Sequence, residues 1–401
     1  MGIFWKKFRN VQWRDIGHIF LFLFAIIPAR FVKRQRPHMW LVCEYGEEAR
    51  DNGYWFFRYM REQNREQDCV YAIDFQADDY ERVKNLGECV PYGSFRHWIY
   101  YLAAEINISS HKGGKPNAAV CYLFEVYGLL KNKRVFLQHG ITKDLAEMFF
   151  YENTKMRLFI CGAKPEFDYV KANFHYPDGY VAYTGFARFD SLLKPVKQKR
   201  QILVVPTWRR WLYTEGSNPY ENGCPDIEES EYYRQWKGFL NSSKLHELLD
   251  KEDFCLTFFP HRNMTSVFEH VTVQSDRVRI CTWKDTDLQE LMKESACMIT
   301  DYSSVAMDFA YLKKPLLYFQ FDYEEYRIKH FEEGYFDYRR DGFGAVCTNQ
   351  KELLSGLIKI LEDNCEVQKE YEKRIRNFFL FRDENNCKRI EMEIRKICND
   401  K

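Results

Sequence analysis

Short apolar runs alternate with amphipathic stretches along most of the chain. In the first half, apolar runs occur at 39–43, 70–73, 106–108, 135–137 and 158–161. Short runs without internal alternation are typical of strands buried on both faces. The stretches between them repeat apolar residues at helical spacing, for example over 47–65 and 120–130. This alternation of strands and helices predicts a parallel, doubly wound α/β sheet.

The second half repeats the pattern, with apolar runs at 202–205, 254–259, 278–281, 297–300 and 316–319. A polar stretch at 191–200 separates the two series and is typical of a linker. We therefore predict an N-terminal α/β domain at 37–195, a C-terminal α/β domain at 196–375 and a terminal helix at 376–401.

The first 36 residues differ from the rest in charge and hydropathy. Eight basic residues against Asp15 give residues 1–36 a net charge of +7, which leaves about −6 for the remainder. Nine consecutive apolar residues at 19–27 end at Pro28, whereas a membrane-spanning helix needs about 20. A short apolar helix with basic flanks is typical of a segment that lies on an anionic membrane surface. The alternative is a buried first helix with solvated basic flanks.

The composition argues against a nucleic-acid-binding protein, a disulfide-bonded protein and a metalloprotein. A net charge of +1 gives no overall basic excess for nucleic-acid binding. The 13 cysteines are scattered and no two have C-x-x-C spacing, which indicates reduced thiols in a cytosolic protein. One Asp-x-Asp sequence, at 285–287, opens a predicted helix and is interpreted as a cap. We predict neither a metal site nor a cofactor.

Polar side chains gather in the turn after the run at 297–300. The turn reads Thr300-Asp301-Tyr302-Ser303-Ser304, and a helix and a further strand follow it. Open α/β sheets bind ligands at the carboxyl ends of their strands. Free backbone N–H groups at a helix start can hold a phosphate. The alternative is a helix N-cap with no other role.

Three more polar clusters follow apolar runs: His139-Gly140, Thr207 to Arg210, and His261-Arg262. An imidazole at a strand end could take a proton from a hydroxyl group. Histidine and arginine side chains suit phosphate oxygens. For each cluster the alternative is structural, either a histidine with a backbone partner or a solvated cation. Because all four clusters follow strands, we expect them to converge on one cleft between two facing sheets.

Taken together, the clusters resemble the CDP-glycerol glycerophosphotransferase family of wall teichoic acid and capsule synthesis. The resemblance spans roughly residues 40–375 and is carried by Gln138-His139-Gly140 with Lys143, Thr184-Gly185 with Arg188 and Asp190, Pro206-Thr207-Trp208-Arg209, Pro260-His261, and the turn at 300–304 with Phe309-Ala310. It implies a GT-B-like fold of two domains facing a cleft. It also implies a peripheral protein on the cytoplasmic face of the membrane. The implied reaction transfers an alditol phosphate from CDP-glycerol or CDP-ribitol to a hydroxyl of an undecaprenyl-linked glycan, teichoic acid or capsule acceptor, and releases CMP.

The resemblance also implies roles for individual residues. His139 would be the general base on the acceptor hydroxyl, and His261 would stabilise the donor pyrophosphate. The predicted phosphate-binding residues are Thr207, Arg209, Arg262, Asp301, Ser303 and Ser304, and the further candidates are Gly140, Lys143, Arg188 and Asp308.

Two other functions fit parts of the pattern. A GT-B glycosyltransferase that uses a nucleotide sugar would share the polar strand ends. A membrane-surface scaffold in capsule assembly would not depend on His139. Because the sequence contains no large additional module for binding long polymer, it favours a single-addition enzyme of the primase type or a capsule-related transferase.

Overall fold

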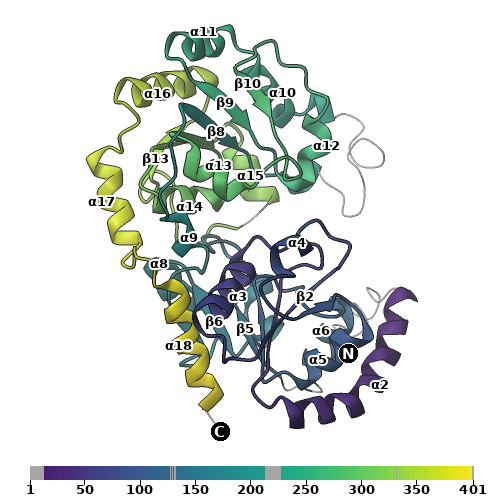
Figure 1. Ribbon diagram of the computed structural model, residues 1–401. Helices are drawn as coiled ribbons and strands as arrows, with labels where there is room; N and C mark the ends of the chain where they lie inside the picture. Colours follow the sequence, from purple (N-terminus) through teal and green to yellow (C-terminus); the bar gives the residue numbers. More distant parts are fainter. Residues whose placement is uncertain are drawn as a thin grey trace. The chain divides into compact units, whose positions relative to one another are not determined.

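The chain folds into two compact α/β units (Figure 1). The computed structural model describes residues 13–126, 128, 130, 132–212, 227–330 and 332–399. The first unit comprises residues 1–141, 147–191 and 383–401, and the second comprises 142–146 and 192–382. Residues 1–12 of the predicted membrane segment, and residues 213–226, lie outside the described residues.

The first unit contains a parallel sheet with the strand order β3-β2-β1-β4-β5-β6-β7. Its strands are β1 (Trp40–Cys43), β2 (Cys69–Ile73), β3 (Cys89–Pro91), β4 (Ile106–Ser109), β5 (Lys133–Phe136), β6 (Leu158–Cys161) and β7 (Val181–Tyr183). The central strands β1, β2 and β4 are buried along their whole length. The strand order reverses direction beside β1, as expected for a doubly wound sheet.

Helices surround this sheet. They are α2 (Trp13–Gln35), α3 (Asn52–Gln63), α4 (Tyr80–Val83), α5 (Phe95–Ala103), α6 (Ala118–Val126), α7 (Tyr151–Thr154), α8 (Lys164–Asn173), α9 (Phe189–Leu192) and α18 (Asn386–Asn399), with a 3₁₀ turn at Glu147–Phe149. Figure 1 shows α2 beside α5 and α6, and α18 on another side of the same unit.

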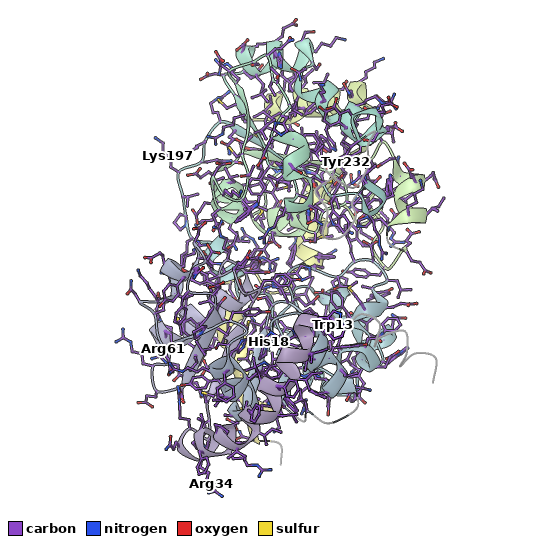
Figure 2. All side chains as sticks on the ribbon, turned by 90° about the vertical axis from the view of Figure 1, so that its right-hand side faces the viewer. Trp13, His18, Arg34, Arg61, Lys197 and Tyr232 are labelled. Carbon is purple, nitrogen blue, oxygen red and sulfur yellow. The ribbon has the colours of Figure 1, made fainter. Side chains whose placement is uncertain are left out.

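Helix α2 is longer than the sequence predicted, because it continues through Pro28. One face packs on the first unit: the Phe22 ring lies 5.7 Å from Trp98 and 4.4 Å from Phe124. The Trp98 indole also donates a hydrogen bond to His18 Nδ1, 3.1 Å away. Trp13 and Arg34 lie toward opposite ends of the helix (Figure 2). Tertiary packing therefore supports the helix across the proline.

The second unit contains a parallel sheet with the order β10-β9-β8-β11-β12-β13. Its strands are β8 (Gln201–Val205), β9 (Cys255–Phe258), β10 (Val278–Ile280), β11 (Cys297–Thr300), β12 (Leu316–Phe319) and β13 (Gly344–Cys347). Its helices are α10 (Glu231–Leu240), α11 (Ser243–Lys251), α12 (Thr265–Phe268), α13 (Leu288–Glu294), α14 (Val305–Tyr311), α15 (Tyr323–Lys329), α16 (Gln350–Glu362) and α17 (Lys369–Phe378), with 3₁₀ turns at Arg210–Leu212, Ile227–Glu229 and Arg262–Met264. The predicted strand-helix-strand unit after residue 297 is β11-α14-β12.

Two segments group differently from the predicted domain ranges. Residues 142–146 belong to the second unit, because Asp144 binds Arg327 at 2.5 Å and Leu145 N donates to the Glu332 carbonyl. Residues 383–401 belong to the first unit. The predicted terminal helix at 376–401 is in fact interrupted between α17 and α18, where Phe378 and Phe379 turn into the core of the second unit.

Candidate functional site

His139 follows a residue with an unusual backbone conformation. Gln138 has φ of 60°, in the left-handed region that non-glycine residues rarely adopt. Its side-chain amide donates to the Ile160 carbonyl at 2.7 Å and to Glu166 Oε1 at 3.0 Å. Such a conformation costs about 1–3 kcal/mol and persists only where its surroundings hold it. The sequence Gln-His-Gly therefore fixes the direction in which His139 leaves β5.

Asn52, at the start of α3, connects the turn at Gln138 to the turn at Arg188. Its amide donates to the Gln138 carbonyl at 2.7 Å, and its Oδ1 accepts from the Arg188 backbone N–H at 3.1 Å. Asn52 is completely buried. No sequence pattern singled out Asn52, because an Asp-Asn pair before a helix is also an ordinary capping sequence.

Arg188 is buried, and its guanidinium donates to Asp51 Oδ1 at 2.7 Å. The turn before it contains Gly185, with φ of 78°. After it, the Asp190 carboxylate accepts hydrogen bonds from the backbone N–H groups of Asn386 and Cys387, both at 2.9 Å. The Gly-x-x-Arg-x-Asp turn thus links α3 to the start of α18.

The His139 ring is exposed to solvent, with Gly140 half-buried after it. The surrounding protein and the Arg188 cation both lower the pKa of His139, while the Ser110 backbone opposes the shift. The direction of this shift means that His139 is neutral near pH 7 and has a nitrogen lone pair for a proton.

In the second unit, the Asp301 side chain connects the end of β11 to the end of β8 through hydrogen bonds. Its Oδ1 accepts from the backbone N–H groups of Thr207 at 2.8 Å and Tyr302 at 2.6 Å. Its Oδ2 lies 2.9 Å from Arg209 Nη1. The structure therefore brings together Thr207, Arg209 and Asp301, three of the predicted residues.

Arg209, a predicted phosphate ligand, lies in the interior of the second unit. Its side chain is fully buried and also binds Asp322, with Nε 2.7 Å from Oδ2. The rings of Tyr232, Tyr302 and Tyr326 surround the guanidinium. Two buried carboxylates hold the cation in the interior, whereas Arg210 next to it is exposed. Arg209 therefore positions Asp301 and does not reach a phosphate in this geometry.

The charges of Arg209, Asp301 and Asp322 compensate one another. Burial raises the pKa of Asp301, and the Arg209 cation and backbone hydrogen bonds oppose that shift. The two carboxylates raise the pKa of Arg209 against the effect of burial. A buried cation with two carboxylate partners is stable only while all three remain together.

Ser303 and Ser304 are half-buried at the start of α14. Ser303 Oγ accepts from the Val305 N–H at 3.2 Å, while Ser304 makes no side-chain capping bond. Ser303 thus caps the helix, and the Ser304 hydroxyl is the one suited to a ligand. Asp308 is buried inside α14.

His261 lies at the end of β9 and is half-buried. Its Nδ1 accepts from the Asn263 N–H at 3.1 Å, and its ring lies 6.0 Å from that of Trp208. Arg262 is exposed and stacks on Trp283, with 4.5 Å between the guanidinium carbon and the ring centroid. The two neighbours therefore have different surroundings.

Lys143 is buried and belongs to the second unit, although it follows His139 closely in sequence. Its Nζ is paired with Asp144, which also binds Arg327. Despite burial, these two cations lower the pKa of Asp144. His139, Gly140 and Arg188 belong to the first unit, and the other predicted residues belong to the second.

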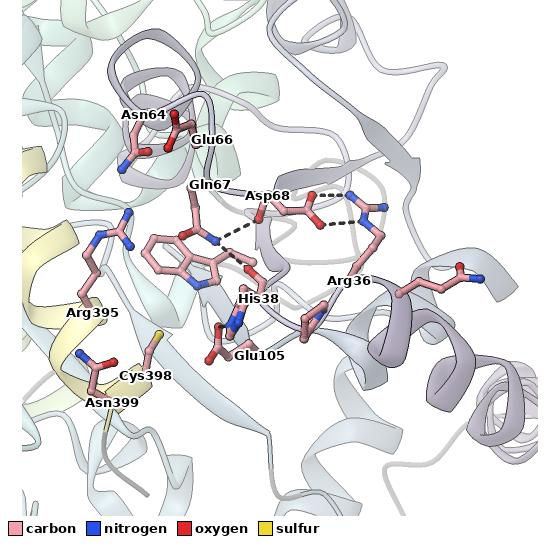
Figure 3. A pocket seen from close by; sticks show the side chains of 13 residues that line it. Arg36, His38, Asn64, Glu66, Gln67, Asp68, Glu105, Arg395, Cys398 and Asn399 are labelled. Atoms are coloured by element: carbon pink, nitrogen blue, oxygen red, sulfur yellow. Dashed lines mark hydrogen bonds and ion pairs between the residues drawn. The ribbon is translucent and has the colours of Figure 1, made fainter.

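A pocket of the first unit lies at the other ends of the strands, where β1 begins. It has a volume of about 650 Å³ and includes Arg36, His38, Asp68 and Arg395 (Figure 3). Trp40, the first residue of β1, also lines it. Arg36 binds Asp68 within this pocket, and no predicted site residue lines it. Within the described residues, no group of three His, Cys, Asp or Glu side chains could hold a metal ion.

Known proteins similar to this chain act in teichoic acid synthesis, according to their descriptions. GgaB of Bacillus subtilis (strain 168), a minor teichoic acid biosynthesis protein, is 34% identical over 378 residues, which are 91% of this chain and 40% of GgaB. A teichoic acid glycerol-phosphate transferase of Staphylococcus aureus is 26% identical over 47% of each chain. The chain thus spans less than half the length of these two relatives.

The fold resembles that of a solved enzyme. The structure of the wall teichoic acid polymerase TagF matches with a TM-score of 0.65 and 18% identity, over 96% of both chains. This likeness confirms the predicted GT-B-like class with two α/β domains. The family model for CDP-glycerol:poly(glycerophosphate) glycerophosphotransferases matches residues 25–396. This chain therefore belongs to the CDP-glycerol:poly(glycerophosphate) glycerophosphotransferase family.

Proposed function

We propose that this chain transfers glycerol phosphate, or a related alditol phosphate, from a CDP-activated donor to a hydroxyl of a lipid-linked glycan, teichoic acid or capsule acceptor. The observation that carries the proposal is the family match over residues 25–396, which includes every candidate site residue. A solved TagF variant was soaked with CDPG, which supports a CDP-linked donor for this fold.

In the proposed reaction, His139 takes the proton of the acceptor hydroxyl. The oxygen then attacks the phosphorus that carries the glycerol, and the bridging P–O bond to CMP breaks. Its position after the constrained Gln138 and its neutral form near pH 7 fit His139 to this role. CMP leaves with the bonding electron pair, so its phosphate gains negative charge.

The second unit would stabilise that charge. His261 and Ser304 are the candidates for direct contact with the donor phosphates, and the Thr207 backbone is held in place by Asp301. Hydrogen-bond donors fixed before the reaction stabilise developing charge without reorganisation. No cofactor and no metal takes part in the proposal.

The proposal is tested by CMP release from purified protein. CDP-glycerol, CDP-ribitol and a UDP-sugar are compared with a short lipid-linked disaccharide acceptor. We expect release from one CDP-alditol, a loss of about 100-fold or more in His139→Asn, and retained CDP binding in that variant. His175→Asn is the matched control, because His175 is exposed and paired with Glu152. Turnover of the UDP-sugar alone would instead support a glycosyltransferase.

We also propose that α2 lies in the membrane interface. An 18-residue window within residues 15–35 has a mean hydropathy of 1.7, and the helix is long and apolar enough to cross a membrane. However, Phe22, Ala25 and Ala29 pack into the first unit, and a spanning position would remove those contacts. The exposed face carries apolar residues, with Phe24 70% and Ile27 65% exposed. Arg30, Lys33 and Arg34 are exposed at the end of the helix, where they would meet anionic head groups.

Sedimentation with anionic vesicles tests this second proposal. We expect the combined change Phe20→Ser, Phe24→Ser and Ile27→Ser to weaken binding on the order of 100-fold or more, since each apolar side chain contributes about 1.5–3 kcal/mol when buried. Met392→Ser on α18 is the control, because Met392 is 53% exposed. Equal binding by the triple variant and the wild type would contradict an interfacial α2.

A further inference from the structure

A second histidine lies beside His139 in the first unit. His111 follows β4 and His139 follows β5, and these two strands are neighbours in the sheet. The two imidazole rings are stacked, with centroids 5.0 Å apart and planes 14° apart. Parallel strands end at one edge of the sheet, so residues far apart in sequence meet there.

His111 is the fixed member of this pair. It is 9% exposed, whereas His139 is exposed. The backbone of His111 is held twice by Ser109, whose Oγ accepts from the His111 N–H at 3.0 Å and donates to the His111 carbonyl at 2.6 Å. The Tyr45 ring lies 4.1 Å from the His111 ring. These contacts leave the His111 ring little freedom to rotate.

Several charged groups face this pair. Asp51 Oδ2 lies 3.9 Å from His111 Nε2, and Arg188 binds the other oxygen of the same carboxylate. On the other side, the buried Glu44 accepts from the Ser110 hydroxyl at 3.4 Å. Burial, the neighbouring His139 and Arg188 all lower the pKa of His111. His111 is therefore neutral at the pH where His139 would accept a proton.

We propose that His111 is a positioning residue for His139: its fixed ring forms a flat surface on which the His139 imidazole stacks. This inference rests on the proposed function, in which His139 accepts the proton of the acceptor hydroxyl. The stack restricts the rotation of His139 and excludes water from one face of the ring. A flat, uncharged ring suffices for both effects, so the nitrogens of His111 are not required.

The test compares His111→Phe, which keeps a flat ring, with His111→Gln, which does not. We expect kcat of His111→Phe to stay within about threefold of the wild type, and kcat of His111→Gln to fall about 10–100-fold with little change in KM for the CDP donor. His175→Gln is the control. A His111→Gln variant with wild-type kcat would overturn the proposal. An equal loss in both variants would overturn it too, because the nitrogens would then be essential.

A second measurement does not depend on turnover. NMR titration of ¹³C-labelled histidine, with His139→Asn used for assignment, gives the pKa of His139 in each variant. We expect it to rise toward 6.5 in His111→Gln, because water then reaches the ring, and to stay low in His111→Phe. An unchanged value in His111→Gln would overturn the stacking role. If no donor supports CMP release, the proposed function fails, and the titration still tests the contact between the rings.

Discussion

Replacement of Arg209 by methionine tests whether this arginine holds the second unit together or binds a phosphate. The change removes the cation and keeps most of the apolar side chain. Asp301 and Asp322 then lose the cation that they share. Both carboxylates remain in the interior, because their side chains are 0% and 3% exposed. Breaking a buried ion pair in this way costs about 3–5 kcal/mol. With two carboxylates left unpaired, we expect a value near the upper end of that range.

Urea unfolding at pH 7, followed by circular dichroism, measures this loss. A triple variant, Arg209→Met with Asp301→Asn and Asp322→Asn, is the decisive control, because no charge then remains buried. It should recover most of the lost unfolding free energy. A loss below about 1 kcal/mol in Arg209→Met, together with a raised KM for the CDP donor, would refute the structural role. Arg209 would then be a phosphate ligand, as the sequence pattern first indicated.

Three further predictions concern stability. Burial lowers the pKa of His97 to about 3, so the stability that its neutral ring contributes above pH 6.5 is lost as the pH falls, by about 2 kcal/mol at pH 5. In urea unfolding, the loss of unfolding free energy between pH 7 and pH 5 should be about 2 kcal/mol smaller in His97→Phe than in the wild type. Gly185→Ala should lower the melting temperature more than Gly179→Ala. Both glycines have φ near 78°, but only a Cβ at position 185 would lie 1.8 Å from Asn386 Oδ1. Equal melting temperatures of the two variants would contradict this contact. Asp190→Ala removes the acceptor for the first N–H groups of α18, and limited proteolysis should then cleave near residue 383 faster than in the wild type.

The sequence by itself determined the architecture of both units. Buried parallel strands appear as short apolar runs, and the helices between them repeat apolar residues at 3.6-residue spacing, so both signals are local. Polar residues directly after an apolar run are also a local signal. This is why the sequence indicated His139, His261 and the turn at 300–304. The edge strand β13 was missed, because Gly344–Cys347 begins with two small residues and carries a weak strand signal.

Only the tertiary structure decided which polar residues turn inward. Arg209 and Arg210 are identical neighbours in sequence, and Arg209 is buried because Asp301 and Asp322 meet it from other elements. His111 gave no separate signal, because its contact with His139 exists only where β4 and β5 lie side by side. Lys143 likewise joins the second unit through Asp144 and Arg327. Burial and charge pairing depend on contacts between distant parts of the chain, and no local pattern of residues encodes them.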